Sequence, residues 1–273
     1  MNIAVTSIQR NRAPYILEWL AFHMVVGVDR FFLYAHRCDD GMPELLLRLS
    51  LHYPITVHRV DTATPPQLPA YHHAWNSDGN DVDWMAFIDG DEFLFPTQAA
   101  TLPEALQRYA DEPLSALAVH WMCYGSSGHL DEPKGLVLEN FTRHAQTDFA
   151  PNRHVKSVVR GHEQGVQINA SHRFETPRGT FDDRLRPVTH GLSPHADPTY
   201  DALRINHYVT QSWGFFESFK QHSGAADINP NMVRPPSWFK HHDRNECDDG
   251  VRWRFLLAVK MKLREMNAFL EGA

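Results

Sequence analysis

The sequence predicts an α/β fold with a mostly parallel sheet flanked by helices, and two observations support this prediction. Near the N-terminus, apolar runs at residues 3–6 and 30–34 enclose a segment of helical spacing at 14–24. A strand, a helix and a second strand in this order favour parallel pairing with a right-handed crossover. Further on, the run 84–88 is apolar throughout, which is typical of a strand buried on both faces.

Local signals support the other elements of the first half. Gly27 suits the end of the first helix, because glycine readily takes the left-handed conformation of helix termini. Pro43 and Pro103 each suit the first turn of a helix, where a missing N–H costs no hydrogen bond. Thr101 and Glu104 match a capping box around Pro103. The other elements expected here are strands at 55–60 and 114–122 and helices at 43–49, 70–77 and 101–109.

The second half has a looser pattern. Short β-like pieces among glycine, proline and histidine turns predict a loop-rich, partly antiparallel region over the front of the sheet. These pieces lie at 136–138, 155–159 and 166–168, and a short helix is expected at 212–221. The last segment, 251–270, is an amphipathic and basic helix. We expect it to pack on its own domain, with a membrane surface or a dimer contact as alternatives.

Composition excludes several classes of protein. The 273 residues suffice for one large α/β domain, and no repeat or linker divides them, so we expect a single domain over 1–273. A net charge of −7 argues against a nucleic-acid binder, which needs a basic face. The 18 histidines form no H-E-x-x-H motif, which argues against a zinc protease. The 3 cysteines show no C-x-x-C spacing and no apolar run is long enough for a membrane span, so the expected location is cytoplasmic.

Three acids follow the buried run 84–88: Asp89, Asp91 and Glu92. In open α/β sheets, ligands bind just beyond the carboxyl ends of the strands. With Gly90 allowing a tight bend, Asp89 and Asp91 can face one point, where two carboxylates repel unless a cation lies between them. A solvated acidic turn is the alternative. The apolar flank at 93–95 favours a metal site for a ligand that carries phosphate.

Five blocks, in order between residues 2 and 222, resemble known glycosyltransferases. They lie at 10–41, 84–95, 121–129, 154–159 and 205–220. The second block reads W-M-A-F-I-D-G-D-E-F-L-F and the third reads W-M-C-Y-G-S-S-G-H. Together they resemble the family-2-like glycosyltransferases, and most closely the family 92 branch of the GT-A superfamily. Two segments depart from the family pattern: R-N-R at 10–12 replaces K-N-E, so that Arg12 stands in place of an acid, and A-H-R-C at 35–38 replaces D-N-x-S, so that Cys38 stands in place of a serine.

The resemblance implies a GT-A-like, Rossmann-like fold and a metal-dependent enzyme. The implied reaction moves a sugar from a nucleoside diphosphate sugar, with UDP the expected nucleotide, to a glycan or lipid-linked acceptor with inversion. Mn²⁺ or Mg²⁺ would stabilise the diphosphate leaving group, and an imidazole ligand favours Mn²⁺. The resemblance also implies a nucleotide-binding half at about 1–122, and an acceptor half with the C-terminal helix at about 123–273.

The resemblance assigns candidate residues to each role. The expected metal ligands are Asp89, Asp91 and His207. The donor is expected to contact Thr6, Asn11, Tyr34, Asp40, Asp89, Lys156 and Lys220, with the two lysines on the diphosphate. Inversion requires a carboxylate that takes the proton of the acceptor hydroxyl. The candidates for this base are Asp131, Glu132 and Glu92, with Glu175 as a further possibility.

Two other functions stay open on the sequence. A metal-dependent phosphohydrolase would need a second metal set, but Asp78, Asp81 and Asp83 precede the strand and should lie at its other end. A non-catalytic binder of sugar nucleotides or carbohydrates could keep this fold, and the changed Arg12 and Cys38 leave room for it. The expected partners are a sugar-nucleotide donor, a carbohydrate or lipid-linked acceptor and, through the C-terminal helix, the inner face of a membrane.

Overall fold

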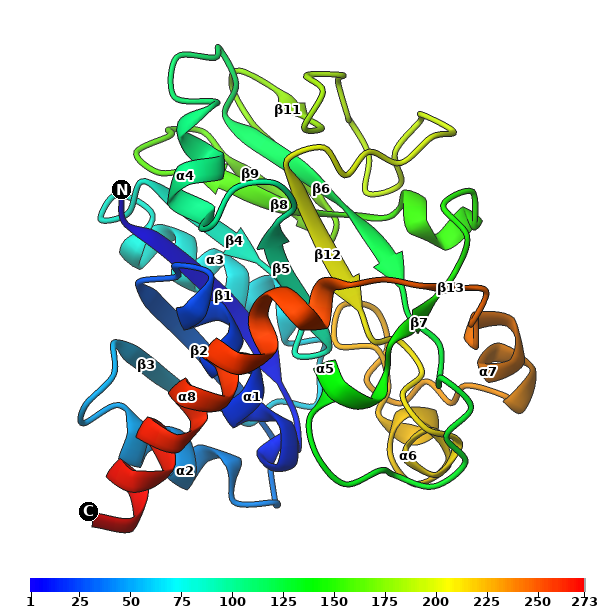
Figure 1. Ribbon diagram of the computed structural model, residues 1–273. Coiled ribbons are helices and arrows are strands. Elements are labelled where there is room, and N and C mark those ends of the chain that lie inside the picture. The colour runs from blue at the N-terminus through cyan, green and yellow to red at the C-terminus, as the bar shows by residue number, and fades with distance from the viewer. Residues whose placement is uncertain (273) are drawn as a thin grey trace.

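Within residues 1–272, which the computed structural model describes, the central feature is a mixed nine-stranded sheet with helices on both faces (Figure 1). Its main strands are β1 (Ile3–Gln9), β2 (Arg30–His36), β3 (Ile55–Val60), β4 (Trp84–Phe87), β5 (Glu92–Pro96), β6 (Ala116–Cys123), β8 (Val155–Arg160) and β12 (Leu203–His207). They lie in the order β3-β2-β1-β4-β8-β6-β12-β5. A short strand, β11 (Thr180–Phe181), pairs with β6 beside this row.

The first half confirms the expected parallel topology. Strand β1 pairs in parallel with both β2 and β4, and β2 pairs in parallel with β3. The helices of this half are α1 (Ala13–Val25), α2 (Met42–Leu49), α3 (Gln67–Asp78) and α4 (Leu102–Gln107). Because the four strands are parallel, their carboxyl ends share one edge of the sheet. We call it the front edge.

The second half adds strands of both directions. Strand β8 is antiparallel to β4 and to β6, whereas β12 is parallel to β6. It follows that β6 and β12 also end at the front edge, and that β8 begins there. His207 at the end of β12 and Val155 at the start of β8 are thus brought to the edge where the acidic turn lies.

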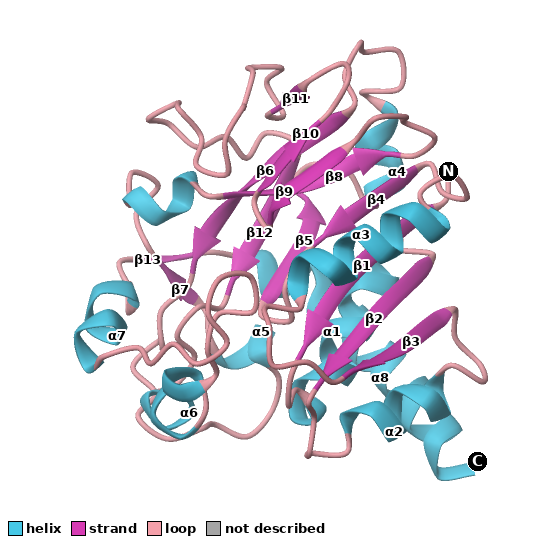
Figure 2. Ribbon diagram, turned by 180° about the vertical axis from the view of Figure 1, so that it is seen from behind, coloured by secondary structure: helices cyan, strands magenta, loops and turns pink. Residues whose placement is uncertain are grey.

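Helices cover the two faces unequally. Helices α1 and α2 pack on one face together with α8 (Val251–Gly272), and α3 packs on the other (Figures 1 and 2). The hairpin of β9 (Gln167–Ala170) and β10 (Arg173–Glu175) lies beside α3. The remaining elements are α5 (Val137–Asn140), α6 (Trp213–Ser218), α7 (Pro236–His242), β7 (Arg143–His144) and β13 (Cys247–Asp248). Among the described helices, none is long and apolar enough to cross a membrane.

Several boundaries differ from the sequence-based expectation. Of residues 136–138, expected to be β-like, Val137 and Leu138 begin α5 and Leu136 caps it, because the carboxylate of Glu18 accepts the backbone N–H groups at the start of that helix. Residues 92–96 form a separate strand, β5, only a short turn after β4. Strand β1 continues to Gln9, three residues beyond the expected end at residue 6. Because β1 ends at Gln9, the residues that it brings to the front edge come later in the chain than expected.

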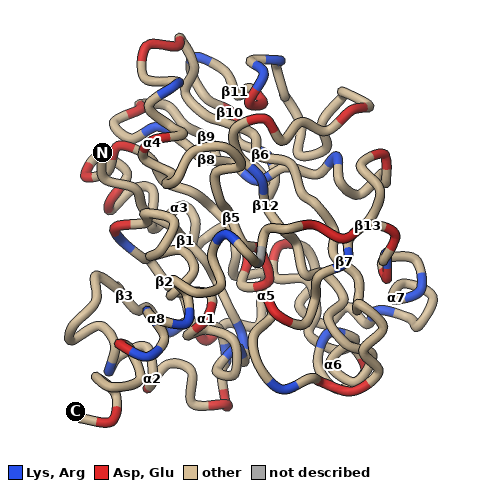
Figure 3. Tube along the Cα trace, in the orientation of Figure 1, with Lys and Arg blue, Asp and Glu red and all other residues tan. Residues whose placement is uncertain are grey.

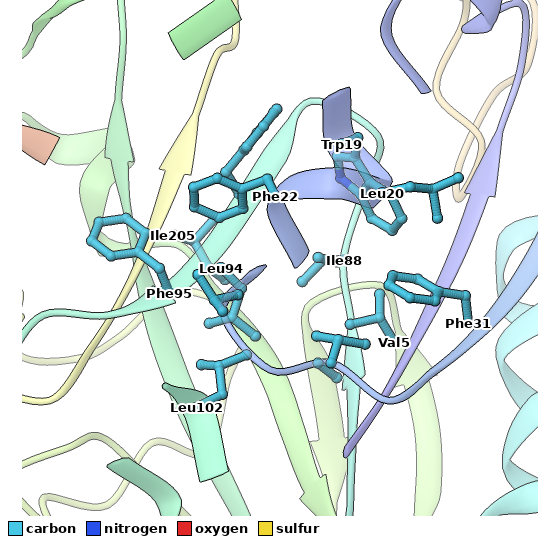
Figure 4. Packing of buried hydrophobic residues seen from close by; sticks show 14 of the residues in the cluster. Val5, Trp19, Leu20, Phe22, Phe31, Ile88, Leu94, Phe95, Leu102 and Ile205 are labelled. Atoms are coloured by element: carbon cyan, nitrogen blue, oxygen red, sulfur yellow. The ribbon is translucent and has the colours of Figure 1, made fainter. Parts of the chain in front are cut away.

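Aromatic side chains fill the core between α1, β5 and α8. Phe22 lies edge-to-face against Phe93 at a centroid distance of 5.0 Å and against Phe255 at 5.4 Å. Phe22 and Phe95 are also close, at 6.2 Å, and Figure 4 shows them beside Leu94 and Ile205. Such aromatic pairs add roughly 0.5–1.5 kcal/mol each beyond the burial of their surface. The packing fixes β5, and with it one side of the acidic turn.

The C-terminal helix packs on its own domain, as expected. Phe255, Val259 and Met266 on one side of α8 are buried against α1, whereas Leu257 on the other side is 74% exposed. Lys and Arg are interspersed with Asp and Glu along the whole trace (Figure 3). Two basic side chains of α8 are engaged within the fold: Arg254 donates to the carbonyls of Pro96, Thr97 and Ala99, and Lys260 contacts Glu139.

Replacing Phe255 with alanine tests whether α8 belongs to the core. We expect Phe255→Ala to lower the free energy of unfolding by about 3–5 kcal/mol, because it removes buried contacts and leaves a cavity. Urea denaturation followed by circular dichroism measures the change. Leu257→Ala, on the exposed side of the same helix, is the matched control and should stay within about 0.5 kcal/mol of the wild type. Equal losses in both variants would contradict this packing.

Glu18 predicts a pH dependence of stability. Burial raises the pKa of Glu18 to about 7 from 4.5, although the N–H groups of Val137 and Leu138 oppose the shift. The folded state therefore binds this proton more tightly than the unfolded state. The contribution to stability is largest below pH 4.5 and is lost as the pH rises to about 7, a change on the order of 3 kcal/mol.

Urea denaturation between about pH 4.5 and 8 measures this dependence. Glu18→Gln keeps the size of the side chain and one acceptor oxygen but cannot ionise, so its free energy of unfolding should fall less steeply over this range than that of the wild type. Parallel curves for the two proteins would show that Glu18 does not titrate as stated.

Candidate active site

The front edge carries a cavity of about 210 Å³, which we call the front pocket. Its lining comes from the end of β1, the turn after β4, the first residue of α3, the hairpin turn at 171–172 and the segment 219–234. Strand ends supply its floor, and loops from the second half close it. The pocket lies where open α/β sheets bind their ligands.

The turn after β4 is held by its own third acid. The backbone N–H of Asp89 donates to Glu92 Oε2 at 2.9 Å, and Glu92 is fully buried. Gly90 lies close to β1: a Cβ atom at this position would lie 2.5 Å from the end of the Gln9 side chain, which would have to move. The structure thus places Asp89 and Asp91 at the pocket, and Glu92 behind them.

Asp89 is bound by a buried lysine. Lys156 Nζ donates to Asp89 Oδ2 at 2.8 Å and lies 3.7 Å from Glu92 Oε1, and Gln67 Nε2 donates to Asp89 Oδ1 at 2.7 Å. Burial lowers the pKa of Lys156, but the carboxylates of Asp89 and Glu92 raise it by more, so it stays above its usual value. Lys156 is 0% exposed. It therefore supports Asp89 from below rather than lining the pocket.

Asp91 faces a histidine and a second lysine. Lys220 Nζ contacts Asp91 Oδ2, and His207 Nε2 lies 3.6 Å from Asp91 Oδ1. Burial raises the pKa of Asp91, but Lys220 and His207 lower it by more. The pKa of this carboxyl therefore lies well below its usual value. The His207 ring packs on Trp121 at 4.1 Å, and burial lowers its pKa. A neutral imidazole beside a carboxylate results.

This pair suits a divalent cation in part. A metal–ligand bond to Mg²⁺ or Mn²⁺ measures about 2.1 Å, so donors 3.6 Å apart can share one ion. In the described chain, however, no group of three His, Cys, Asp or Glu side chains gathers at one point. Asp89 turns instead to Lys156 and Gln67. Asp91 and His207 would therefore hold the cation, with phosphate oxygens of a ligand completing its shell, as is usual for Mg²⁺ sites.

Arg12 is an unexpected part of the site. Its guanidinium donates to the carbonyl of Gly90 at 3.1 Å and to Gln211 Oε1 at 3.2 Å, and it lies 4.4 Å from the centre of the Tyr15 ring. Burial lowers its pKa, while the charge of Asp91 raises it. Only the departure of Arg12 from the family pattern signalled this residue. The base in place of an acid is explained by its contact with the acidic turn.

Besides Lys156, four residues expected at the donor do not line the front pocket. Thr6 is fully buried within β1, because the strand continues past it. The side chain of Asn11 bonds to Asp39, and both carboxylate oxygens of Asp40 accept backbone N–H groups, from Ala13 and Met42. Tyr34 lies on the face of the sheet that α3 covers, where its ring stacks on that of His58 at a centroid distance of 4.7 Å.

The expected base candidates lie elsewhere as well. Glu132 accepts from the hydroxyls of Tyr15 at 2.7 Å and Ser212 at 2.6 Å, which ties the 130–133 loop to α1 and α6. Asp131 is exposed beside it, and Glu175 pairs with Arg173 on the hairpin. Of the described residues, neither these nor Glu92 line the front pocket. The pocket carries instead Gln67, Ser171, His172, Asp227 and Arg234, which no periodic pattern in the sequence marks.

Fold and pocket together define the class: an α/β protein with a charged ligand site at the carboxyl edge of its sheet. The chain belongs to glycosyltransferase family 92, whose model matches residues 4–240. A family 92 protein of Oryza sativa subsp. japonica is 30% identical over 219 residues, covering 79% of this chain and 34% of its own length. One of Arabidopsis thaliana is 26% identical over 267 residues, with coverages of 87% and 43%. The chain thus spans between a third and a half of these relatives.

Solved structures with some likeness of fold are more distant. TarS of S. aureus is 14% identical, with a TM-score of 0.39 over 59% of this chain and 47% of that chain. Glucosyl-3-phosphoglycerate synthase from Mycobacterium tuberculosis, in complex with Mn²⁺, UDP and phosphoglyceric acid, is 14% identical, with a TM-score of 0.32 over 44% and 43%. Likenesses this distant say nothing of what this chain binds. The family model and the relatives confirm the family resemblance.

Lys156 provides a test of the buried support under the acidic turn. We expect Lys156→Ala to lower the free energy of unfolding by about 3–5 kcal/mol, because it leaves Asp89 and Glu92 without their counter-charge. Urea denaturation measures the change, and Lys134→Ala, at an exposed position, should stay within about 0.5 kcal/mol of wild type. A Lys156→Ala loss as small as that of the control would rule out this support.

Proposed function

We propose that this chain transfers a sugar from a nucleoside diphosphate sugar, with UDP as the nucleotide, to a hydroxyl of a glycan or lipid-linked acceptor, with inversion at the anomeric carbon. The observation that carries the proposal is the position of Asp91, which lines a pocket that also presents cationic side chains and lies 3.6 Å from the buried His207. Membership of family 92 supports the reaction class.

The pocket offers charges for both parts of a metal diphosphate. Asp91 and His207 would hold Mn²⁺ or Mg²⁺, which as a Lewis acid stabilises the negative charge of the leaving diphosphate. Lys220 and Arg234 line the same pocket. Lys220 contacts Asp91. With Asp91 bound to such a cation, Lys220 would be free to bind a phosphate oxygen of the donor.

Asp89 has a different role from Asp91 in this proposal. Asp89 lies 31% exposed at the pocket while Lys156 and Gln67 hold it from behind. A carboxylate in this position can accept a hydroxyl of the donor ribose or sugar. Arg12, bonded to the carbonyl of Gly90, keeps the backbone of the turn in place. The site therefore orients the donor with fixed groups rather than with flexible surface side chains, as electrostatic catalysis requires.

The phosphohydrolase alternative finds no support at this site. It would use a second set of metal ligands close to the first. Asp83, at the other end of β4, accepts from the backbone of Asn2 instead, and Asp78 pairs with Arg30. Among the described residues, the carboxylates that line the front pocket are Asp89, Asp91 and Asp227.

A thermal-shift assay tests the donor site. A ligand that binds only the folded state stabilises it by about 2.7 kcal/mol at a hundredfold excess over its Kd. We expect UDP and UDP-sugars to raise the melting temperature of the wild type in the presence of Mn²⁺, and less so without it. Asp91→Ala should abolish the Mn²⁺-dependent part. The matched control is Asp81→Ala, an exposed acid before β4, which should behave as the wild type.

Three results would argue against this proposal. Stabilisation by UDP that is equal with and without Mn²⁺ would remove the metal from it. A Mn²⁺-dependent shift that persists in Asp91→Ala would move the metal elsewhere. Binding of donor without release of UDP in the presence of any acceptor or water would favour a sugar-nucleotide binder on the same fold.

A further inference from the structure

One carboxylate in the front pocket has no lysine partner. Of the three carboxylates that line the pocket in the described chain, Asp89 is bound by Lys156 and Asp91 by Lys220. The third, Asp227, accepts a hydrogen bond from Ser171 Oγ to its Oδ2 at 2.6 Å. Its other oxygen, Oδ1, makes no hydrogen bond within the described residues. This oxygen is available to a ligand.

Asp227 is held in position although it lies in a loop. Ala225 and Asn229 exchange two backbone hydrogen bonds, of 2.8 and 3.0 Å, across the loop that carries it. The carbonyl of Ala226 also accepts from the backbone N–H of Gln67 at the start of α3. Ser171, which donates to the carboxylate, is only 2% exposed on the hairpin turn. The carboxylate is therefore fixed between α3 and the hairpin.

The position faces the proposed metal site. The guanidinium of Arg234 interacts electrostatically with both Asp91 and Asp227, and all three residues line the front pocket. A sugar whose diphosphate lies at Asp91 would thus have Asp227 as a second carboxylate in the same pocket. A displacement with inversion requires a base at the attacking hydroxyl, and Asp227 can take this role because Asp91 is assigned to the metal.

We propose that Asp227 is the general base of the transfer reaction, an assignment that rests on the proposed function. Asp227 Oδ1 takes the proton of the acceptor hydroxyl as its oxygen attacks the anomeric carbon of the donor. A bond forms between this oxygen and the anomeric carbon, the bond from that carbon to the diphosphate oxygen breaks, and its electron pair leaves with the diphosphate. Ser171 acts as a positioning residue, because its O–H fixes the orientation of the carboxylate.

Release of UDP in the presence of water alone tests this role without knowledge of the natural acceptor. The probes are UDP-glucose and UDP-N-acetylglucosamine with Mn²⁺, and free UDP is measured. We expect Asp227→Asn to reduce UDP release by about 10²–10⁴-fold, the usual contribution of a general base. Asparagine keeps an acceptor for Ser171, so UDP should raise the melting temperature of this variant as it does that of the wild type.

Sodium azide separates a base from a residue that merely shapes the loop. Azide is already an anion and needs no base, so it should restore UDP release in Asp227→Asn and yield a glycosyl azide of inverted configuration. Ser171→Ala keeps the carboxylate and should lose less activity than Asp227→Asn. Asp148→Asn, at an exposed loop position, is the matched control and should leave UDP release unchanged.

The outcomes distinguish this assignment from the proposed function. Lost release with unchanged UDP binding and rescue by azide would support Asp227 as the base. Release at the wild-type rate in Asp227→Asn, or a loss that azide does not rescue, would overturn the assignment and leave the proposed function in place. A wild type that neither binds UDP nor releases it from either donor would refute the proposed function, and the base with it.

Discussion

The site depends on the ion pairs that a lysine buried under the acidic turn makes with two of its carboxylates. Lys156 comes from the start of β8, the strand that runs against the direction of β4, and so its side chain lies beneath the turn that follows β4. Its contacts with Asp89 and Glu92 join two parts of the chain that are more than sixty residues apart. Isolated charges are costly to bury, and only mutual pairing makes the arrangement stable. Lys156 therefore stabilises the turn at the pocket although its own side chain does not line the pocket.

Charged side chains at the surface of the front pocket are also held by partners within the chain. Asp91 is paired with Lys220, and Arg12 is bonded to the carbonyl of Gly90, so these two charged groups of the front pocket have partners within the chain. In the proposed function, a cation and a diphosphate would replace these partners together, so that neither Asp91 nor Lys220 would be left without an opposite charge. The side chains of the pocket would then keep their positions when the ligand binds, and few of them would have to move during a reaction.

Part of this site is predictable from sequence, and the errors have a common cause. Asp89 and Asp91 follow an apolar run, and a strand end is where a ligand site is expected, so their place at the pocket was predicted. The apolar runs at 3–6 and 30–34 predict strand ends beside Thr6 and Tyr34, and hence a donor contact for both residues. Both strands continue, since Gln9 still pairs with Ala35, and the strand ends move away from those side chains. Where a strand ends depends on its neighbours, which local composition does not record.

By itself, the sequence determined the parallel first half, the acidic turn at a strand end and the C-terminal helix that packs on its own domain. These features follow from apolar periodicity, from the chirality of strand–helix–strand connections and from glycine at a close approach. Only the tertiary structure decided which charges meet. Lys156 reaches the acidic turn from β8 and Lys220 reaches it from the segment after α6, while Asp227 lines the same pocket from a loop further along the chain. Contacts between distant loops leave no periodic signal, because they are fixed by how the whole sheet pairs and closes.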